Sequence, residues 1–233
     1  MSQLGEGIIE AFRLIISLDE GLLRIVFLSL RISGLAIIIS TFIGVPLGTL
    51  LGLKAEKKTR LVNKLIFTFM GTPPVVAGLL IYLLISRMGP FGVLGLIYTP
   101  TAMIIAQVTL ATPIIAGLTM VGVRSKGTAV VETARSLGAG QGLVTWTIIK
   151  ESRISILGAI ITGFGRIIAE VGAVMIVGGN IEGQTRVMTT AIVLETRQGN
   201  FELAIGLGII LLLLSFIVNS FLYNIQRGGG SSD

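Results

Sequence analysis

The stretch that decides the class of protein is ISGLAIIISTFIGVPLGTLLGL, residues 32–53. It runs for 22 residues without a charged side chain. At a rise of about 1.5 Å per residue, a helix of this length crosses the hydrocarbon core of a bilayer, which is about 30 Å thick. This stretch therefore predicts a membrane-spanning helix.

Four further stretches have the same apolar character along the rest of the chain. The four are residues 65–86, 101–123, 154–181 and 203–226. Residues 101–123 follow two prolines that predict a loop, Pro90 and Pro100, and residues 154–181 are apolar except for Arg166 and Glu170. Together with residues 32–53, they predict an all-α integral membrane protein with about five transmembrane helices.

The composition of the whole chain agrees with a membrane protein. Of its 233 residues, 52% are hydrophobic and 13% are charged, whereas a soluble domain carries about 25% charged residues. The chain has no Cys and no His, which excludes disulfides, thiolate metal sites and imidazole acid–base chemistry. No Asp lies in any predicted span, which disfavours an intramembrane enzyme with paired aspartates. The sequence predicts a protein that is not an enzyme.

The basic residues predict the orientation in the membrane. Eleven of the eighteen Lys and Arg residues lie in residues 54–64, in residues 124–153 or at Arg227, which all fall on one side of the predicted spans. Basic residues gather in cytoplasmic loops, so the N-terminus is expected outside and the C-terminus in the cytoplasm. The same bias explains the net charge of +6 without nucleic-acid binding.

The two ends of the chain differ from the predicted transmembrane domain, residues 25–227. Residues 1–24 combine apolar residues at helical spacing with acidic and basic ones, so we expect an interfacial helix that lies on the membrane. Residues 228–233, GGGSSD, predict a flexible tail.

The longest cytoplasmic segment predicted is residues 124–153. Two apolar stripes at helical spacing are separated by Gly138, Gly140 and Gly142, which predicts two short helices joined by a turn. Such a protrusion is either a solvated connector or a docking surface for a soluble partner. Trp146, the only Trp in the chain, suits an interface but suits a membrane boundary equally well.

Part of this segment resembles the EAA loop of ATP-binding-cassette (ABC) importer permeases. That pattern reads Glu-Ala-Ala, three residues, Gly, nine residues, Ile, one residue, Leu-Pro. Four residues match it at the right spacing, and three depart from it: Glu132, Ala134, Gly138 and Ile148 match, whereas Thr133, Lys150 and Glu151 differ. The resemblance implies that these four residues belong to the coupling helix, which fits a groove on the nucleotide-binding subunit.

Three other stretches resemble the permeases of the molybdate, tungstate and sulfate type. They are GTPPVVAG (residues 71–78), GRIIAEVGA (residues 165–173) and MIVGGNI (residues 175–181), the last being most similar to tungstate permeases. The resemblance runs from about Leu30 to Tyr223 and implies the type I importer permease (MetI-like) fold.

This resemblance implies the transmembrane subunit of an ATP-driven oxyanion importer, for tungstate or else molybdate. It further implies a homodimer in a prokaryotic plasma membrane, two ABC ATPase subunits and an extracytoplasmic oxyanion-binding protein. No phosphate-binding loop of the type Gly-x-x-x-x-Gly-Lys-Ser/Thr occurs in the chain. We therefore expect no cofactor on this chain, and ATP and Mg²⁺ on the partner subunit.

Polar residues within the spans are candidates for the translocation path or its gate. Arg166 and Glu170 are four residues apart and are expected on one helix face. They either neutralise each other as a structural ion pair or face a path for a dianion. Thr72, Pro73 and Asn180 complete the candidate set. An alternative function is an ATP-independent secondary transporter or channel with Glu170 as a proton carrier.

Glycines recur every fourth residue in the first predicted span, at Gly44, Gly48 and Gly52. Such a row of small residues predicts a close contact with another helix.

Overall fold

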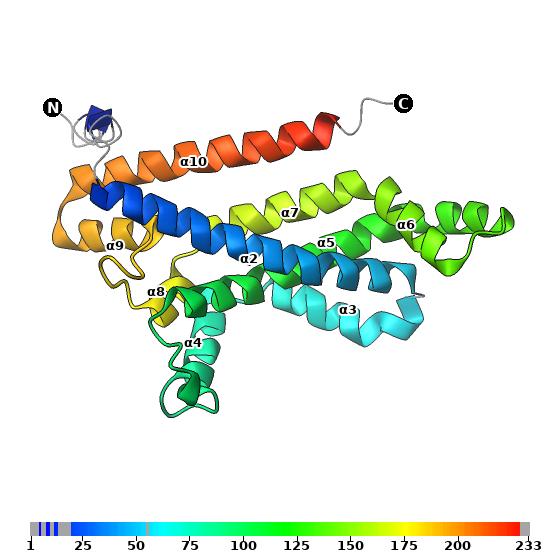
Figure 1. Cartoon of the computed structure of the whole chain (residues 1–233), viewed down its shortest axis with the longest axis horizontal. Helices are drawn as coiled ribbons and strands as arrows, with labels where there is room; N and C mark the ends of the chain where they lie inside the picture. The colour runs from blue at the N-terminus through cyan, green and yellow to red at the C-terminus, as the bar shows by residue number, and fades with distance from the viewer. Residues whose placement is uncertain (1–4, 6–7, 10–11, 14–19, 55, 229–233) are drawn as a thin grey trace. The chain divides into compact units, whose positions relative to one another are not determined.

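The computed structural model describes residues 5, 8–9, 12–13, 20–54 and 56–228, which contain helices and no β-strand (Figure 1). The interfacial helix predicted over residues 1–24 therefore lies mostly outside the described residues, as does most of the predicted tail. The elements in chain order are α2 (Glu20–Leu53), α3 (Glu56–Met70), α4 (Pro74–Ile85), the 3₁₀ turn η1 (Gly92–Leu94), α5 (Pro100–Ser136), α6 (Gln141–Glu151), α7 (Arg153–Ile168), α8 (Gly172–Gly178), α9 (Met188–Gln198) and α10 (Phe201–Gly228).

Three described helices are by themselves long and apolar enough to cross a membrane. These are α2, the part of α5 over Pro100–Gly127 and the part of α10 over Phe201–Ile225. The other two predicted spans fall on the pairs α3 with α4 and α7 with α8, each of which bends at a short break. Counting each bent pair as one span gives up to five spans.

The span predicted over residues 65–86 is divided between two helices, because α3 ends at Met70 and α4 begins at Pro74. Pro73 and Pro74 have no backbone N–H, and proline disfavours helical geometry in the residue before it. The amides of Gly71 and Thr72 instead close tight turns onto the carbonyls of Thr68 and Phe69, at 3.1 and 3.2 Å. Pro74 then occupies the first turn of α4, where a missing N–H costs nothing.

The chain forms two compact units. The first, unit 1, consists of Met1–Ala36, Pro73–Gln107 and Ile167–Val218. One of its apolar clusters joins α2, α9 and α10 through the buried residues Leu22, Met188, Ala191, Leu207 and Ile210. In the same unit α4 packs closely on α8, because a Cβ at Gly78 would lie 2.6 Å from the Cα atom of Ala173.

Unit 2 consists of Ile37–Thr72, Val108–Arg166 and Asn219–Asp233. Here the glycine row of α2 lies against α5, which confirms the predicted close helix contact. A Cβ at Gly48 would lie 2.4 Å from the carbonyl oxygen of Ala116, and one at Gly52 would lie 2.6 Å from Cγ1 of Val123. Only glycine allows the two backbones to approach this far.

The end of α5 differs from the prediction. The helix predicted over residues 101–123 continues for 13 further residues to Ser136, so α5 is a single helix of 37 residues. Of the two short helices predicted within residues 124–153, only the second exists as a separate element, α6. The stripe of Val130, Val131 and Ala134 extends α5 because it packs against the apolar face of α6.

Candidate functional site

The turn between α5 and α6 explains the spacing of the importer motif. Gly138 has a φ of +79°, a left-handed conformation that glycine adopts without strain. Its amide donates to the carbonyl of Arg135 at 2.9 Å, and the amide of Ala139 donates to the carbonyl of Ala134 at 3.0 Å. This pair of bonds is the Schellman motif, which satisfies carbonyls at the end of a helix.

The other motif residues lie on the two sides of that turn. Ile148 of α6 is fully buried in a cluster with Val123 and Val144, and Ala134 packs against this cluster from α5. Glu132 is exposed. Ala134, Gly138 and Ile148 therefore hold α6 against α5, which leaves the Glu132 side chain available to a partner.

A shallow apolar groove of about 590 Å³ runs between the end of α5 and α6. Around it the large side chains of Leu137 and Leu143 are 82% and 58% exposed, and that of Trp146 on α6 is 66% exposed. The residues that line the groove are Val130, Thr133, Ala134, Leu137, Gly138, Ala139, Gly140, Leu143, Thr147 and Glu151. An exposed apolar surface of this kind, with a polar border, is typical of a protein–protein contact.

The second candidate site, in unit 1, is the break between α7 and α8. Arg166 lies in the last turn of α7, whereas Glu170 lies beyond its end at Ile168, so the prediction that both share one helix face is wrong. The Glu170 side chain is 4% exposed, and its carboxylate accepts a hydrogen bond from the amide of Ala173 at 3.1 Å. The carboxylate thus caps the start of α8 instead of continuing α7, as acidic side chains do at helix N-termini.

Two residues that the sequence analysis missed complete this break. The buried Gln107 of α5 donates from Nε2 to the carbonyl of Ile167 at 3.1 Å. Thr189 of α9 donates from its hydroxyl to the carbonyl of Glu170 at 2.9 Å. Broken helices at membrane depth need such partners for their free backbone groups. Gln107 could have been found, because it is the one amide side chain in residues 101–123, but nothing in the sequence marks Thr189.

The remaining candidates lie at different places. Thr72 is in the turn after α3, where its hydroxyl donates to the carbonyl of Thr68 at 3.4 Å, and Pro73 directly precedes α4. In unit 1 the start of α4 meets the start of α8, since a Cβ at Gly172 would lie 2.7 Å from Cγ2 of Val75. The structure thus brings the GTPPVVAG and GRIIAEVGA stretches into contact at these two residues.

Asn180 lies at the other end of α8. It has a φ of +52°, and the preceding Gly179 has a φ of +71°, where a Cβ would lie 2.7 Å from the ring of Tyr98. Tyr98 is also left-handed, with a φ of +59°. The hydrogen bond between the side chains of Tyr98 and Tyr82 is the main cause that raises the pKa of Tyr98. The loop that contains Tyr98 and the end of α8 are therefore in close contact, through the Tyr98 ring and Gly179.

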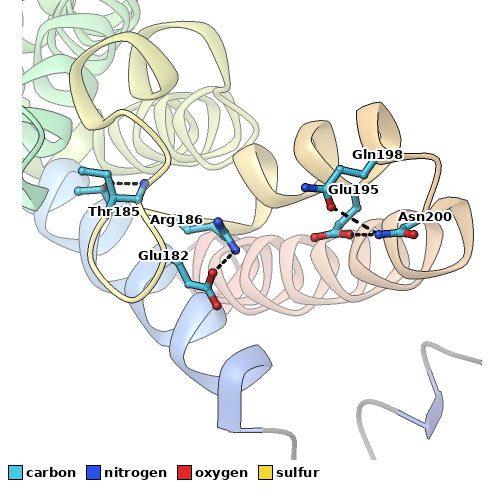
Figure 2. A network of polar contacts seen from close by, with 7 residues as sticks. Glu182, Thr185, Arg186, Glu195, Gln198 and Asn200 are labelled. Atoms are coloured by element: carbon cyan, nitrogen blue, oxygen red, sulfur yellow. Dashed lines mark hydrogen bonds and ion pairs between the residues drawn. The ribbon is translucent and has the colours of Figure 1, made fainter.

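The loop after Asn180 is held by short-range polar contacts (Figure 2). The hydroxyl of Thr185 accepts from the amide of Ile181 at 2.9 Å, and Arg186 forms an ion pair with Glu182 at 3.3 Å. Beyond α9, Asn200 donates to Glu195 at 2.9 Å. The loop thus leads into the start of α9, whereas the turn at Asn200 joins the end of α9 to the start of α10 (Figure 2).

Comparison with known proteins assigns a class to this arrangement of helices. Residues 44–228 match the family described as binding-protein-dependent transport system inner membrane component. The chain belongs to this family, whose members are the permease subunits of ABC transporters.

Two relatives and one solved structure show how far the similarity extends. The chain is 40% identical to a tungstate uptake system permease protein of Peptoclostridium acidaminophilum, over 97% of this chain and all of the relative. It is 35% identical to a protein of the same description from Campylobacter jejuni, over 95% of this chain and 93% of the relative. Its fold matches a chain of the MetNI methionine ABC transporter in an inward-facing conformation with a TM-score of 0.76 and 17% identity, over 90% of this chain and 96% of that one.

These matches confirm the predicted MetI-like permease fold and the resemblance to oxyanion permeases. Permease subunits of this class have no ATPase motifs, so the chain is not itself an ATPase and hydrolysis belongs to a separate subunit. The comparisons favour an ATP-driven importer over an ATP-independent transporter with Glu170 as a proton carrier.

Proposed function

We propose that this chain is the transmembrane subunit of an ATP-driven importer for tungstate, or else for molybdate. The observation that carries the proposal is the 40% identity to a tungstate uptake permease over the whole length of that relative. The MIVGGNI stretch, residues 175–181, supports tungstate in particular, because it is most similar to tungstate permeases.

The proposed complex contains two copies of this chain, with the pore on their two-fold axis, two ABC ATPase subunits and an extracytoplasmic oxyanion-binding protein. ATP and Mg²⁺ are held by the ATPase subunits, and this chain binds no cofactor. The complex lies in a prokaryotic plasma membrane, with the N-terminus of this chain outside and its C-terminus in the cytoplasm.

The α5–α6 groove is the proposed docking surface for the ATPase. Its apolar lining and the exposed Leu137, Leu143 and Trp146 suit an apolar ridge on the partner, and Glu132 beside it suits a cationic group. When ATP closes the two ATPase subunits, the docked segments are drawn together and the pore turns outward. Hydrolysis reverses the change, so the permease alternates between two packings.

The proposed translocation path uses polar groups that bind the dianion weakly, because a tight site would trap the ion. Arg166 is exposed at the end of α7 and supplies guanidinium donors. Glu170 positions the start of α8 through its bond to Ala173 and does not itself contact the anion. Thr72, Pro73 and Asn180 are the proposed gate positions, since each lies where a helix is interrupted.

Uptake by the reconstituted complex tests this function. Proteoliposomes that contain the permease and its ATPase are supplied with binding protein and labelled tungstate, with or without ATP. We expect ATP-dependent uptake that unlabelled molybdate inhibits less strongly than unlabelled tungstate. Uptake that persists without ATP would contradict the proposal and support the secondary transporter. Arg166→Ala should lower uptake without loss of the assembled complex; unchanged uptake would remove Arg166 from the path.

A further inference from the structure

A buried cluster of polar groups in unit 2 links α5 to the two helices before it. Arg124 of α5 donates from Nη2 to the carbonyl oxygen of Leu51, near the end of α2, at 3.2 Å. The same nitrogen donates to the hydroxyl of Thr59 on α3 at 3.1 Å. Thr59 and the neighbouring Asn63 are 4% and 6% exposed. We call Arg124, the Leu51 carbonyl, Thr59 and Asn63 the Arg124 joint.

The amide of Asn63 also takes part. With its oxygen turned toward the guanidinium, this oxygen accepts from Nη1 and Nη2 of Arg124 at 3.3 and 2.9 Å, and its nitrogen donates to the Thr59 carbonyl at 3.2 Å. One guanidinium then reaches acceptors on two other helices. Its planar fork of five donors suits such a set of acceptors, whereas a lysine ammonium on a flexible stem does not.

The joint also compensates a feature of α2. The last turn of that helix contains no basic residue, although its final carbonyls carry the negative end of the helix dipole. Arg124 supplies this positive charge from a helix 73 residues further along the chain. Because the acceptors are buried, displacement of Arg124 would remove a hydrogen-bond donor that water replaces poorly, which makes the joint resistant to sliding.

The joint lies next to the proposed docking segment. Val123, the residue before Arg124, belongs to the buried cluster that holds α6 through Val144 and Ile148. Arg124 also lines a polar cavity of about 450 Å³ together with Glu132, the exposed residue of the importer motif. The rest of the cavity is lined by Gly52, Leu53, Lys54, Glu56, Gly127, Val131 and Arg135.

We propose that Arg124 is a positioning residue for energy coupling, an inference that rests on the proposed function. The buried cluster ties α6 to the end of α5, and the Arg124 joint ties the end of α5 to α2 and α3. A displacement of the docked α6 therefore carries the ends of α2 and α3 with it. Without the joint, α5 and α6 move alone, and ATP hydrolysis is used without a matching change in the transmembrane helices.

The test measures tungstate transported per ATP hydrolysed in proteoliposomes that contain the full complex. We expect Arg124→Met and Arg124→Lys to assemble with the ATPase and to hydrolyse ATP, with the transport ratio lowered about three- to tenfold. A residue that only stabilised the fold would lower the amount of complex and leave the ratio unchanged. Arg60→Met, which removes an exposed cation from α3, is the matched control and should keep the wild-type ratio.

If the Arg124 variants do not accumulate, the acceptors are replaced instead. Thr59→Val and Asn63→Leu introduce apolar side chains of nearly the same size, and both are expected to lower the ratio of tungstate transported to ATP hydrolysed. A wild-type ratio in Arg124→Met, or in both acceptor variants, overturns the inference. Absence of uptake by the wild-type complex would instead overturn the proposed function, because the Arg124 joint is intact in that complex.

A second measurement tests the joint without transport. The chain has no cysteine, so spin labels can be attached at Lys58→Cys on α3 and Lys150→Cys on α6, both exposed. In the complex with Arg124 present, we expect one narrow distribution of distances between the two spin labels, the same with and without ATP. Arg124→Met should broaden it or make it depend on ATP. A narrow, unchanged distribution in Arg124→Met would show that α3 and α6 are tied by other contacts and overturn the inference.

Discussion

At the scale of single residues, Gly138 has a backbone φ of +79°, and a Cβ built there would meet no atom within 4 Å. The requirement for glycine is therefore conformational and not steric. The left-handed region costs a residue with a Cβ about 1–2 kcal/mol. The glycine of the importer motif is thus explained by the turn that ends α5, independently of any contact with a partner.

Gly138→Ala is expected to destabilise the α5–α6 turn by about 1–2 kcal/mol, because the left-handed conformation must be kept with a Cβ present. Hydrogen exchange of the amides in residues 133–148, measured in detergent, reports this local stability. Gly142→Ala is the control: it lies inside α6, its Cβ also meets no atom within 4 Å, and alanine favours a helix by up to about 1 kcal/mol. Equal exchange in both variants would contradict the conformational explanation.

At the scale of elements, α2 and α5 pack through a row of glycines, and α5 and α6 pack through Val123, Val144 and Ile148. The first contact is so close that it leaves no room for a side chain at the α2 glycines, whereas the second is an ordinary apolar core. The two contacts therefore respond differently to substitution: the first to any added atom, the second to lost volume.

Gly48→Ala should destabilise the protein by about 1–3 kcal/mol, because its Cβ would lie 2.4 Å from the Ala116 carbonyl oxygen and the helices would have to separate. Thermal unfolding of the purified protein measures the effect. Gly34→Ala serves as the control on the same helix, since its Cβ would meet no atom within 4 Å. If both variants unfold at the wild-type temperature, the close packing of α2 on α5 is refuted.

Leu143 lines the α5–α6 groove and is 58% exposed, so a charge there would be placed in the proposed apolar contact. Leu143→Glu is expected to weaken association with the ATPase subunit about tenfold or more, as replacement of a central interface residue does. Affinity measured with the purified ATPase tests this. Gln141→Glu adds the same charge at an exposed residue that does not line the groove, and it should bind normally. Equal loss in both variants would indicate a general charge effect.

At the scale of the whole molecule, the groove, the Arg124 joint and the Glu170 break each lie within a single unit. The groove and the Arg124 joint lie entirely in unit 2, and the Glu170 break lies in unit 1. The helix α5 contributes to both, with Gln107 at the break and Arg124 at the joint. The single helix α5 therefore contributes one residue to the Glu170 break and another to the Arg124 joint.

The orientation of the whole chain is tested with single cysteines in this cysteine-free protein. Lys58→Cys lies in the basic segment and Met88→Cys is at a fully exposed position after α4. A membrane-impermeant maleimide should label Met88→Cys in right-side-out vesicles and Lys58→Cys only in inverted ones, because basic segments stay in the cytoplasm. The opposite pattern would reverse the proposed orientation.

The sequence alone determined the class of protein, and the reason is local. Uncharged runs such as residues 32–53, the glycine row at Gly44, Gly48 and Gly52, and the importer motif are each visible within one segment. The uncharged runs are interpreted from their length, the glycine row from the small size of glycine, and the importer motif from the spacing of its residues. These properties need no knowledge of which segments meet.

What only the tertiary structure decided depends on contacts between distant segments. The break at Glu170 is completed by Gln107 and Thr189 from two other helices, so its place could not be found from residues 154–181 alone. The extension of α5 to Ser136 depends on α6 covering its apolar stripe. Arg124 was one of many basic residues in the sequence, and only folding brings it to the Leu51 carbonyl and Thr59. Arg124 thus connects α5 to α2 and α3, because buried acceptors bind a donor more strongly than acceptors that are hydrated.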